Sequence, residues 1–420
     1  MSNNNKTPAI RFKGFTDTWE QRKLGDMVDR VTRKNTNLES ELPLTISAQY
    51  GLIDQNEFFD KRIASKDVSG YYLLKKGEFA YNKSTSSDAP WGAVKRLDRY
   101  ENGVLSTLYI VFALKENGNI NSDFLVSYYD TDCWHKGIQA IAAEGARNHG
   151  LLNITPADYF ETTLNVPKNM EEQKQIGRYF QNLDNLITLH QRKCDKLIQF
   201  KAAMLKKMFP QNGADKPELR FKGFTDAWEQ RKLGELMEIT SVKRIHQSDW
   251  TDSGVRFLRA RDIVAVSKNE EVSEPLFISQ EKYDEYSALS GKVKIGDLLV
   301  TGVGTIGVPM LINNEEPLYF KDGNIIWFKN EDRIDGEFFY HSFNGSFIQN
   351  FIKESAGIGT VGTYTIESGK KTPILLPTQK DEQQKIGTFF SQLDTLITLH
   401  QRKCDKYKSI KAGLIRKFFP

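Results

Sequence analysis

A repeat of apolar residues over residues 171–208 restricts the fold of this chain more than any other feature. Apolar or centrally placed residues recur at alternating steps of four and three, which keeps one stripe of an α-helix facing a partner helix. No proline interrupts the stretch, Pro210 closes it, and Asn169 with Glu172 can form a capping box at its start. The pattern predicts one helix of a coiled coil, roughly 55 Å long. Its seam consists of Ile176, Phe180, Leu183, Ile187, His190, Cys194, Leu197, Lys201, Met204 and Met208.

The partner helix lies in the same chain. Residues 183–196 read LDNLITLHQRKCDK and residues 393–406 read LDTLITLHQRKCDK, a shift of 393 − 183 = 210 residues. Because neither helix can bury its seam alone, we expect the two copies to pack together. A compact block, about 40 Å across, joins them, and it leaves and re-enters at one end only if the helices are antiparallel. The second seam consists of Ile386, Phe390, Leu393, Ile397, His400, Cys404, Tyr407, Lys411, Leu414 and Phe418.

The chain as a whole is a tandem repeat. Residues 11–25 read RFKGFTDTWEQRKLG and return almost unchanged at residues 220–234. Residues 34–148 and 243–360 share only scattered features. The repeated segments are therefore expected to have the same role in both halves, whereas the divergent blocks can have two different roles of the same kind. Antiparallel helices would place a globular block at each end and bring the chain termini together. We predict a disordered arm at 1–10, a first globular domain at 11–168, a helix at 169–210, a linker at 211–219, a second globular domain at 220–378 and a second helix at 379–420.

Within the two globular domains, short apolar runs alternate with turn residues, which is typical of an α/β or α+β domain. Helices are expected at residues 124–129 and 338–351, and final strands at 164–167 and 374–377 lead into the long helices. The other expected strands are residues 42–48, 71–74, 78–81 and 105–114 in the first domain and 255–259, 297–301, 310–312 and 324–328 in the second.

Composition sets the broad class of protein. The 420 residues are 39% hydrophobic and 27% charged, as in an ordinary globular protein of two or three domains. No apolar run approaches the roughly 20 residues that span a bilayer, and the first ten residues have no apolar core of a secretion signal. Three cysteines without zinc-type spacing favour a reducing compartment, so we expect a cytoplasmic protein. The net charge of +4 permits nucleic-acid binding without requiring it.

The sequence contains no recognisable catalytic or cofactor motif. Gly302, Gly304 and Gly307 fit a dinucleotide fingerprint, but the residues that follow indicate a turn and a strand where that fingerprint needs a helix. We therefore interpret the stretch as a glycine-rich hairpin, whose backbone N–H groups can still approach a phosphate. Lys370 does not belong to a phosphate loop, since Tyr364 stands where that motif has glycine. No catalytic, cofactor-binding or metal-binding residue is predicted.

Nucleic-acid binding is indicated by clusters of basic and amide residues in loops of both domains. Arg and Asn can read guanine and adenine edges, while Lys, Ser, Thr and loop N–H groups can hold phosphates. Each cluster alone is more often a solvated surface, and it is the recurrence in both domains that favours binding. The candidate DNA-binding residues are Arg33, Lys34, Asn82, Lys83, Ser84, Arg147, Asn148, Lys243, Arg244, Arg259, Arg261, Thr301, Thr305 and Thr360.

A second set of residues is predicted to form helix or partner interfaces. Trp19 and Trp228 are either docking residues or local core, and the seam residues pack helix on helix. The basic residues near the end of the first helix suit either a solvated helix end or phosphate contact. The interface candidates are Phe180, Leu183, Ile187, Cys194, Leu197, Phe390, Leu393, Ile397, Cys404, Tyr407, Trp19 and Trp228.

Taken together, the chain resembles the specificity subunit of a type I restriction-modification system over its whole length. The resemblance rests on the tandem of a variable block and a long helix, and on WEQRKLG at residues 19–25 and 228–234. It also rests on the helix entries VPKNMEEQKQIGRYFQNLD at 166–184 and LPTQKDEQQKIGTFFSQLD at 376–394. In the first domain, residues 81–87 stand where the second has its glycine hairpin.

The resemblance implies that each variable block is a target recognition domain that reads one half of a split, asymmetric DNA site. The paired helices would set the spacer and dock two modification subunits, which carry S-adenosylmethionine and methylate adenine. Restriction motor-nuclease subunits, with ATP and Mg²⁺, would complete the complex. The chain itself would have no catalytic activity.

Two other classes of function remain open from the residues alone. A coiled-coil adaptor with two protein-binding or glycan-binding domains explains the helices and the divergence, but not the basic loop clusters. An enzyme that acts on DNA would combine chemistry and recognition in this chain. Salt-dependent DNA affinity separates the first alternative from our interpretation, and turnover by the isolated chain separates the second.

Overall fold

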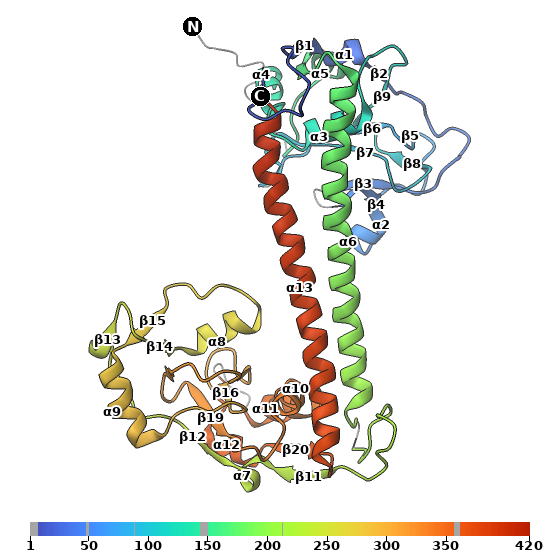
Figure 1. Cartoon of the computed structure of the whole chain (residues 1–420). Coiled ribbons are helices and arrows are strands. Elements are labelled where there is room, and N and C mark those ends of the chain that lie inside the picture. The colour runs from blue at the N-terminus through green and yellow to red at the C-terminus, as the bar shows by residue number, and fades with distance from the viewer. Residues whose placement is uncertain (1–6, 48–49, 88, 143–149, 212, 357–361) are drawn as a thin grey trace. The chain divides into compact units, whose positions relative to one another are not determined.

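Two 39-residue helices, α6 (Met170–Met208) and α13 (Lys380–Phe418), dominate the computed structural model of this protein (Figure 1). The structure describes the chain except for residues 1–6, 48–49, 88, 143–149, 212 and 357–361. The described chain forms two compact units, which we call unit 1 (residues 1–189 and 403–420) and unit 2 (residues 190–402). Each unit thus contains part of both long helices, and we call the remainder of each unit its head.

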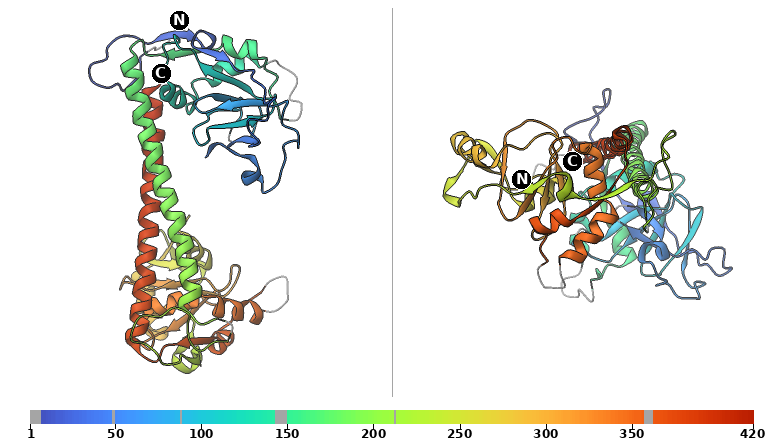
Figure 2. Two further views of the ribbon diagram at one scale, coloured as in Figure 1. Left: turned by 90° about the vertical axis from the view of Figure 1, so that its right-hand side faces the viewer. Right: turned by 90° about the horizontal axis from the view of Figure 1, so that it is seen from below.

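Within each unit the two helices run antiparallel, as predicted. In unit 1, Lys411 Nζ lies 2.7 Å from Asp184 Oδ1, and the Cys404 thiol lies 3.8 Å from the Ile187 carbonyl oxygen. Residue numbers therefore rise along α6 as they fall along α13. Unit 2 shows the same order, because His190 faces His400 and Lys201 pairs with Asp394 at 2.6 Å. The antiparallel pairing of α6 and α13 can be followed in Figure 2.

The heads share one framework. Each contains a four-stranded antiparallel sheet in which the strand that comes last along the chain lies second in the sheet. In unit 1 the order is β2 (Val28–Arg30), β9 (Ile110–Leu114), β6 (Phe79–Asn82) and β7 (Ala93–Arg96). In unit 2 it is β12 (Glu238–Thr240), β19 (Ile325–Lys329), β16 (Leu298–Thr301) and β17 (Pro309–Leu311).

The other framework elements also occur in pairs. A two-stranded ribbon, β1 with β10 in unit 1 and β11 with β20 in unit 2, ties the entry segment to the strand that leads into each long helix. Unit 1 has β1 (Glu20–Lys23), α1 (Leu24–Met27), α3 (Ser122–Tyr129), α4 (His135–Ile141), α5 (Pro156–Glu161) and β10 (Thr163–Val166). Unit 2 has β11 (Glu229–Lys232), α7 (Leu233–Leu236), α10 (Gly336–Phe343), α11 (Ser346–Ser355), α12 (Ile366–Lys371) and β20 (Pro373–Leu376).

The inserted strands differ between the heads. Unit 1 carries two separate two-stranded sheets, β3 with β4 and β5 with β8, whereas unit 2 carries one four-stranded sheet in the order β13-β15-β14-β18. The inserts of unit 1 are β3 (Leu44–Ser47), β4 (Gly51–Asp54), α2 (Gln55–Phe59), β5 (Tyr72–Lys75) and β8 (Asn102–Leu105). Those of unit 2 are the 3₁₀ turn Gln247–Asp249, β13 (Trp250–Thr251), β14 (Val255–Leu258), α8 (Ala260–Ser267), β15 (Leu276–Ile278), α9 (Gln280–Ser290) and β18 (Leu318–Phe320).

Two predicted elements are each split in the structure. The strand expected at residues 105–114 is interrupted by a turn, in which Tyr109 N–H donates to the Ser106 carbonyl, so β8 and β9 belong to different sheets. The helix expected at 338–351 breaks after Phe343, because Gly345 N–H donates back to the Ser342 carbonyl and closes α10.

The motif at the start of each long helix fixes the head to that helix. Arg11 makes a two-pronged hydrogen bond to Glu172, at 2.8 and 2.7 Å, and Gln173 Oε1 accepts from Asn121 N–H at 2.8 Å. Unit 2 repeats both contacts, through Arg220 with Glu382 and Gln383 with Asp335. The predicted capping box is therefore wrong in its second half, since the carboxylate of Glu172 binds Arg11 instead of turning back to residue 169.

A glycine lies about one turn further along each long helix, and the backbone of the head packs directly against it. A Cβ atom at Gly177 would lie 2.6 Å from the backbone nitrogen of Phe124, at the first turn of α3. At Gly387 it would lie 2.7 Å from the nitrogen of Phe338 in α10. Only glycine permits this close approach, because any larger residue would meet backbone atoms.

The first residues that the structure describes meet the end of α13 in unit 1. Ile10 N–H donates to the Lys417 carbonyl, and the ring of Phe12 packs on Phe418 at 5.3 Å. Pro8 is buried. The predicted arm at residues 1–10 is thus too long, since its last residues belong to the fold, while residues 1–6 lie outside the described chain.

Candidate nucleic-acid interface

The glycine stretch after β16 forms the hairpin predicted from the sequence. β16 and β17 pair antiparallel, with Thr301 N–H donating to the Val308 carbonyl. Gly304 and Gly307 have φ angles of 69° and 75°, which residues with a side chain rarely adopt. A strand follows the glycines, so the arrangement that a dinucleotide requires is not formed here.

Each hairpin lies against the segment that precedes the last short helix of its head. In unit 2, Tyr364 N–H donates to the Gly302 carbonyl. In unit 1, Leu152 N–H donates to the Lys83 carbonyl, and both the backbone and the hydroxyl of Thr85 bind the Gly150 carbonyl. The equivalent loops of the two heads are therefore residues 83–92 and 302–308, although their sequences differ. The predicted residues Arg147, Asn148 and Thr360 lie just before these partner segments, outside the described residues.

Three DNA-binding candidates of unit 1, Asn82, Lys83 and Ser84, lie at the base of the loop. Asn82 accepts a hydrogen bond from Ser84 N–H at 3.0 Å, which shapes the turn. Lys83 is half-buried, its Nζ donates to the Ile154 carbonyl at 3.3 Å, and burial lowers the pKa of its ammonium group. Ser84 is exposed. Its hydroxyl is the group of this trio that is open to a ligand.

Arg33 and Lys34 already have partners within unit 1. The guanidinium of Arg33 binds both carboxylate oxygens of Glu78, at 2.7 and 2.8 Å. Lys34 donates to the Gly70 carbonyl and lies over the ring of Tyr72 at 4.2 Å. Any DNA contact by Arg33 must therefore compete with Glu78.

The basic candidates of unit 2 differ in how many hydrogen-bond and ion-pair partners their side chains already have. Lys243 is exposed and lies over the ring of Tyr286, and Arg244 is exposed with its guanidinium on Asp322 at 2.9 Å. Arg259 is held from several sides, since it donates to both oxygens of Asp262 and to the carbonyls of residues 273 and 274. Arg261 pairs with Glu274 at 3.1 Å.

Thr301 is wrong as a DNA-binding candidate. Its side chain is 0% exposed, its hydroxyl donates to the Thr305 carbonyl, and the same oxygen accepts from Val308 N–H at 3.0 Å. The residue holds the hairpin from inside, because the last position of β16 points its side chain into the loop. Thr305, at the tip, is exposed.

Sequence reasoning missed a groove of about 410 Å³ beside the unit 2 hairpin. Its lining combines apolar side chains, including Val303, Ile326 and Ile366, with the hydroxyl residues Ser241, Thr363 and Thr365 and the carboxylate of Glu367. These residues come from four separate segments, so no local pattern could have revealed the groove. Its combination of hydroxyls and apolar side chains next to the hairpin suits the edge of a base with a methyl group.

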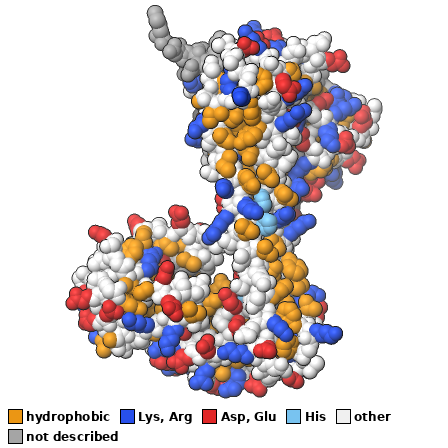
Figure 3. Space-filling view, viewed as in Figure 1, with side chains coloured by type: hydrophobic (Ala, Val, Ile, Leu, Met, Phe, Trp, Pro, Cys, Tyr) orange, Lys and Arg blue, Asp and Glu red, His pale blue; other side chains and the backbone are white. Residues whose placement is uncertain are grey.

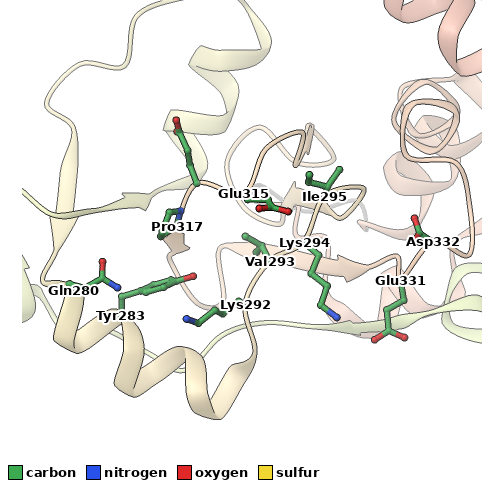
Figure 4. Close-up of a pocket in the computed structure, with 11 residues that line it drawn as sticks. Gln280, Tyr283, Lys292, Val293, Lys294, Ile295, Glu315, Pro317, Glu331 and Asp332 are labelled. Atoms are coloured by element: carbon green, nitrogen blue, oxygen red, sulfur yellow. The ribbon is translucent and has the colours of Figure 1, made fainter.

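A second hollow in unit 2, of about 700 Å³, lies at the opposite end of β16 and β17 (Figure 4). Lys292 and Lys294 precede β16, whereas Glu315, Glu331 and Asp332 follow β17 and β19. The lining mixes both signs of charge and includes none of the predicted DNA-binding residues. We do not assign it to nucleic acid.

The interface candidates lie either in the packing of the two long helices on each other or in the core where a head meets them. Trp19 and Trp228 are 1% and 4% exposed and pack on Phe124 and Phe338, so they are local core and inaccessible to a partner. The fully buried seam candidates are Phe180, Leu183, Cys194, Phe390, Leu393 and Cys404, and the partly buried ones are Ile187, Leu197, Ile397 and Tyr407.

A charged cluster marks the place where each head meets both helices. In unit 1, Lys411 binds Asp184 and also Asp130, at 2.8 Å, and Lys95 binds Asp130 from the head. These two ammonium groups outweigh desolvation and lower the pKa of the buried Asp130.

In unit 2 the head brings both an imidazole and a carboxylate to this cluster, since His341 Nε2 lies 3.9 Å from Glu337 Oε2. His341 Nε2 lies 3.9 Å from Asp394, which pairs with Lys201. Burial, with a smaller effect of Lys201, lowers the pKa of His341 to about 3. The imidazole is therefore neutral at physiological pH, and its Nε2 is buried without a hydrogen-bond partner among the described residues.

Neither a membrane span nor a metal site emerges from the described part of the chain. None of the helices described here is both long enough and apolar enough to cross a membrane. Over the same residues, no three His, Cys, Asp or Glu side chains converge as they would around a metal ion.

Comparison with known proteins gives a consistent result. The family model of the type I restriction modification DNA specificity domain matches the chain twice, over residues 16–199 and 225–408. The type I restriction enzyme MjaVIII specificity subunit of Methanocaldococcus jannaschii is 27% identical over 333 residues, which are 75% of this chain and 70% of that protein. The putative MjaX specificity subunit of the same organism is 21% identical over 424 residues, covering 95% of this chain and 92% of the relative.

A solved structure has the same fold. The crystal structure of a type I restriction-modification system S subunit from M. genitalium matches with a TM-score of 0.64 and 15% identity, covering 99% of each chain. The two family matches correspond to the two repeats and together span most of the sequence. The chain therefore belongs to the family of type I restriction-modification DNA specificity subunits.

Proposed function

We propose that each head reads one half of a split, asymmetric DNA site. The observation that carries this proposal is the shared framework with different inserts, because two readers of one kind need a common scaffold and different contact surfaces. The loops at residues 83–92 and 302–308 join equivalent strands of that framework. The family assignment leaves the adaptor alternative without support.

Recognition would combine phosphate contacts with base contacts. Exposed Ser84 and Thr305 and the backbone of the glycine hairpin can hold phosphates, whereas exposed Lys243 and Arg244 can reach phosphates or base edges. The groove beside Val303 would receive a methyl-bearing base edge. Contacts of this kind depend on loop shape, so the two loops are expected to read different bases.

The long helices would set the distance between the half-sites and dock two modification subunits. Leu189 and Leu399 occupy equivalent positions in the two repeats and are 46% and 44% exposed. Exposed leucines at equivalent positions favour binding of the same partner twice. Restriction motor-nuclease subunits would join this assembly.

Chemistry would reside in the partner subunits. As a specificity subunit, the chain recognises DNA and does not itself methylate or cleave it. We place S-adenosylmethionine, ATP and Mg²⁺ in the modification and motor-nuclease subunits, and the whole complex in the cytoplasm.

Exchange of one insert tests the proposal. Residues 34–148 would be replaced by the corresponding block of another family member, and the chain co-expressed with its modification subunits. Sequencing of methylated DNA should then show one changed half-site, an unchanged second half-site and an unchanged gap. The reciprocal exchange of residues 243–360 should change only the other half. A change in both halves after either exchange would contradict the assignment of one half-site to each head.

A further inference from the structure

The net positive charge of this chain is concentrated in one repeated stretch. The sequence HQRKCDK, at residues 190–196 and 400–406, contributes three cations and one anion in each copy. Without these two copies the chain has 58 − 6 = 52 basic and 54 − 2 = 52 acidic residues and is neutral. A globular protein gains no stability from gathering unbalanced charge, so this concentration points to an external anion.

The stretch lies at the middle of both long helices. In unit 2, His190 Nδ1 faces His400 Nδ1 at 2.9 Å, so the first residues of the two copies meet there and the copies then run in opposite directions along the antiparallel helices. Figure 3 shows Lys and Arg side chains gathered around these two histidines. The basic residues of the repeated stretch that belong to unit 2 are Arg192, Lys193, Lys196 and Arg402, which we call the mid-helix cations.

The mid-helix cations are exposed, and no ion pair joins any of them to a carboxylate among the described residues. Some other lysines of the same helices are paired, as Lys201 is with Asp394 and Lys207 with Glu218, whereas Lys206 and Lys408 are exposed and have no ion pair among the described residues. Lys196 neighbours both Arg192, four residues before it, and Lys193, three residues before it, on the helix surface. Asp195 of the same stretch accepts a hydrogen bond from Gln191. Exposed cations without a carboxylate partner in the fold can bind a polyanion.

We propose that the mid-helix cations bind the phosphate backbone of the duplex between the two half-sites. This inference rests on the proposed function, because a split site leaves an unread segment of duplex between the parts that the two heads read. An unread segment varies in sequence and offers only phosphates as constant groups, which Lys and Arg bind without sequence preference. The second repeat carries the same exposed residues, including Lys403 and Lys406, although helix pairing requires none of them.

The test replaces the four mid-helix cations by Gln, as R192Q/K193Q/K196Q/R402Q, in the complex with the modification subunits. A matched control, R178Q/K206Q/K408Q/R416Q, removes two arginines and two lysines that are also exposed on α6 and α13. Binding would be measured against salt concentration on a duplex carrying the methylated site, and on the same duplex with neutral methylphosphonates in the gap only.

The mid-helix variant should lower the slope of log affinity against log salt by about 0.9 for each phosphate that the protein no longer neutralises, up to about 3.6. The control should leave the slope unchanged. Methylphosphonates in the gap should weaken the wild-type complex to the level of the mid-helix variant, and should not weaken that variant further.

Three outcomes would overturn the inference. The mid-helix variant could bind both duplexes as the wild type does. Its loss of affinity could persist on the methylphosphonate duplex, which would place the contacts elsewhere on the DNA. It could also fail to assemble with the modification subunits in the absence of DNA, as measured by size-exclusion chromatography, which would make these cations a protein-docking surface. Failure of the wild-type complex to prefer its methylated site would instead refute the proposed function.

Discussion

The backbone of the unit 1 head packs closely on Gly177, a contact that we call the glycine notch. From its distances we can predict how much a side chain at this position would destabilise the protein. In Gly177→Ala, the new Cβ atom would lie 2.6 Å from Phe124 N and 2.7 Å from the Asp123 carbonyl carbon. Ordinary contact begins at 3.4 Å, so α3 must retreat by about 3.4 − 2.6 = 0.8 Å. That movement would stretch the bond between Asn121 N–H and Gln173, one turn away, which is now 2.8 Å long.

Three effects set the expected change in stability. Alanine in place of glycine stabilises a helix by about 1 kcal/mol. Overpacking against backbone atoms costs about 1–3 kcal/mol, and weakening the Gln173 bond costs about 1 kcal/mol. We therefore expect Gly177→Ala to lower the free energy of unfolding by about 1–3 kcal/mol.

Gly413 provides a matched control, because it lies in α13 and a Cβ atom there would have no neighbour within 4 Å. Gly413→Ala should raise the free energy of unfolding by about 1 kcal/mol. Urea unfolding followed by circular dichroism measures both changes, and methylation of half-site variants should show weaker recognition only by the unit 1 head in Gly177→Ala. Equal stabilisation by both substitutions would contradict the close packing of the head on Gly177.

Three further predictions address the helices and the unit 2 head. Insertion of four residues, about 6 Å of helix, into both α6 and α13 should lengthen the unread gap by roughly two base pairs, and an unchanged gap in the methylated sites would contradict the spacer role. Glu382→Gln breaks the buried pair with Arg220 and should cost about 3–5 kcal/mol in urea unfolding, whereas Glu235→Gln, in an exposed pair with Arg231, should cost under about 1 kcal/mol; similar losses would argue against a buried anchor. The folded-state pKa of His341 lies below its unfolded value, so its contribution is present above pH 6.5 and is lost as the pH falls towards 3. Between pH 7.5 and 5.5 this loss is about 1.4 kcal/mol, and His341→Gln should remove it; identical pH dependence of wild type and variant would contradict the assignment.

The long helices and their direction could be predicted because the information is local. A step of four and three residues fixes a seam wherever the helix lies, and the 210-residue shift supplies the partner. The hairpin at residues 302–307 was predicted for the same reason, since glycines with positive φ followed by a strand allow little else. For the heads, only the fold class was predicted, and two of the predicted elements are each split into two in the structure.

Side-chain partners could not be predicted in the same way. Glu172 binds Arg11, 161 residues away, instead of capping its own helix, and Thr301 turns its hydroxyl inward to the hairpin. Arg33 has a carboxylate partner, Glu78, that no sequence pattern identifies. The candidates chosen from the sequence therefore mix groups that are free with groups that the fold already uses.

The sequence by itself determined the duplication, the two paired helices and the concentration of positive charge at their middle, because repeats and periodicity are properties of neighbouring residues. Only the tertiary structure decided which cations form no ion pair with a carboxylate and which tryptophans are buried. It also decided at which glycines the backbone of a head packs against a long helix. These outcomes depend on side chains brought together from distant parts of the chain, and burial and charge pairing are settled only when those parts meet.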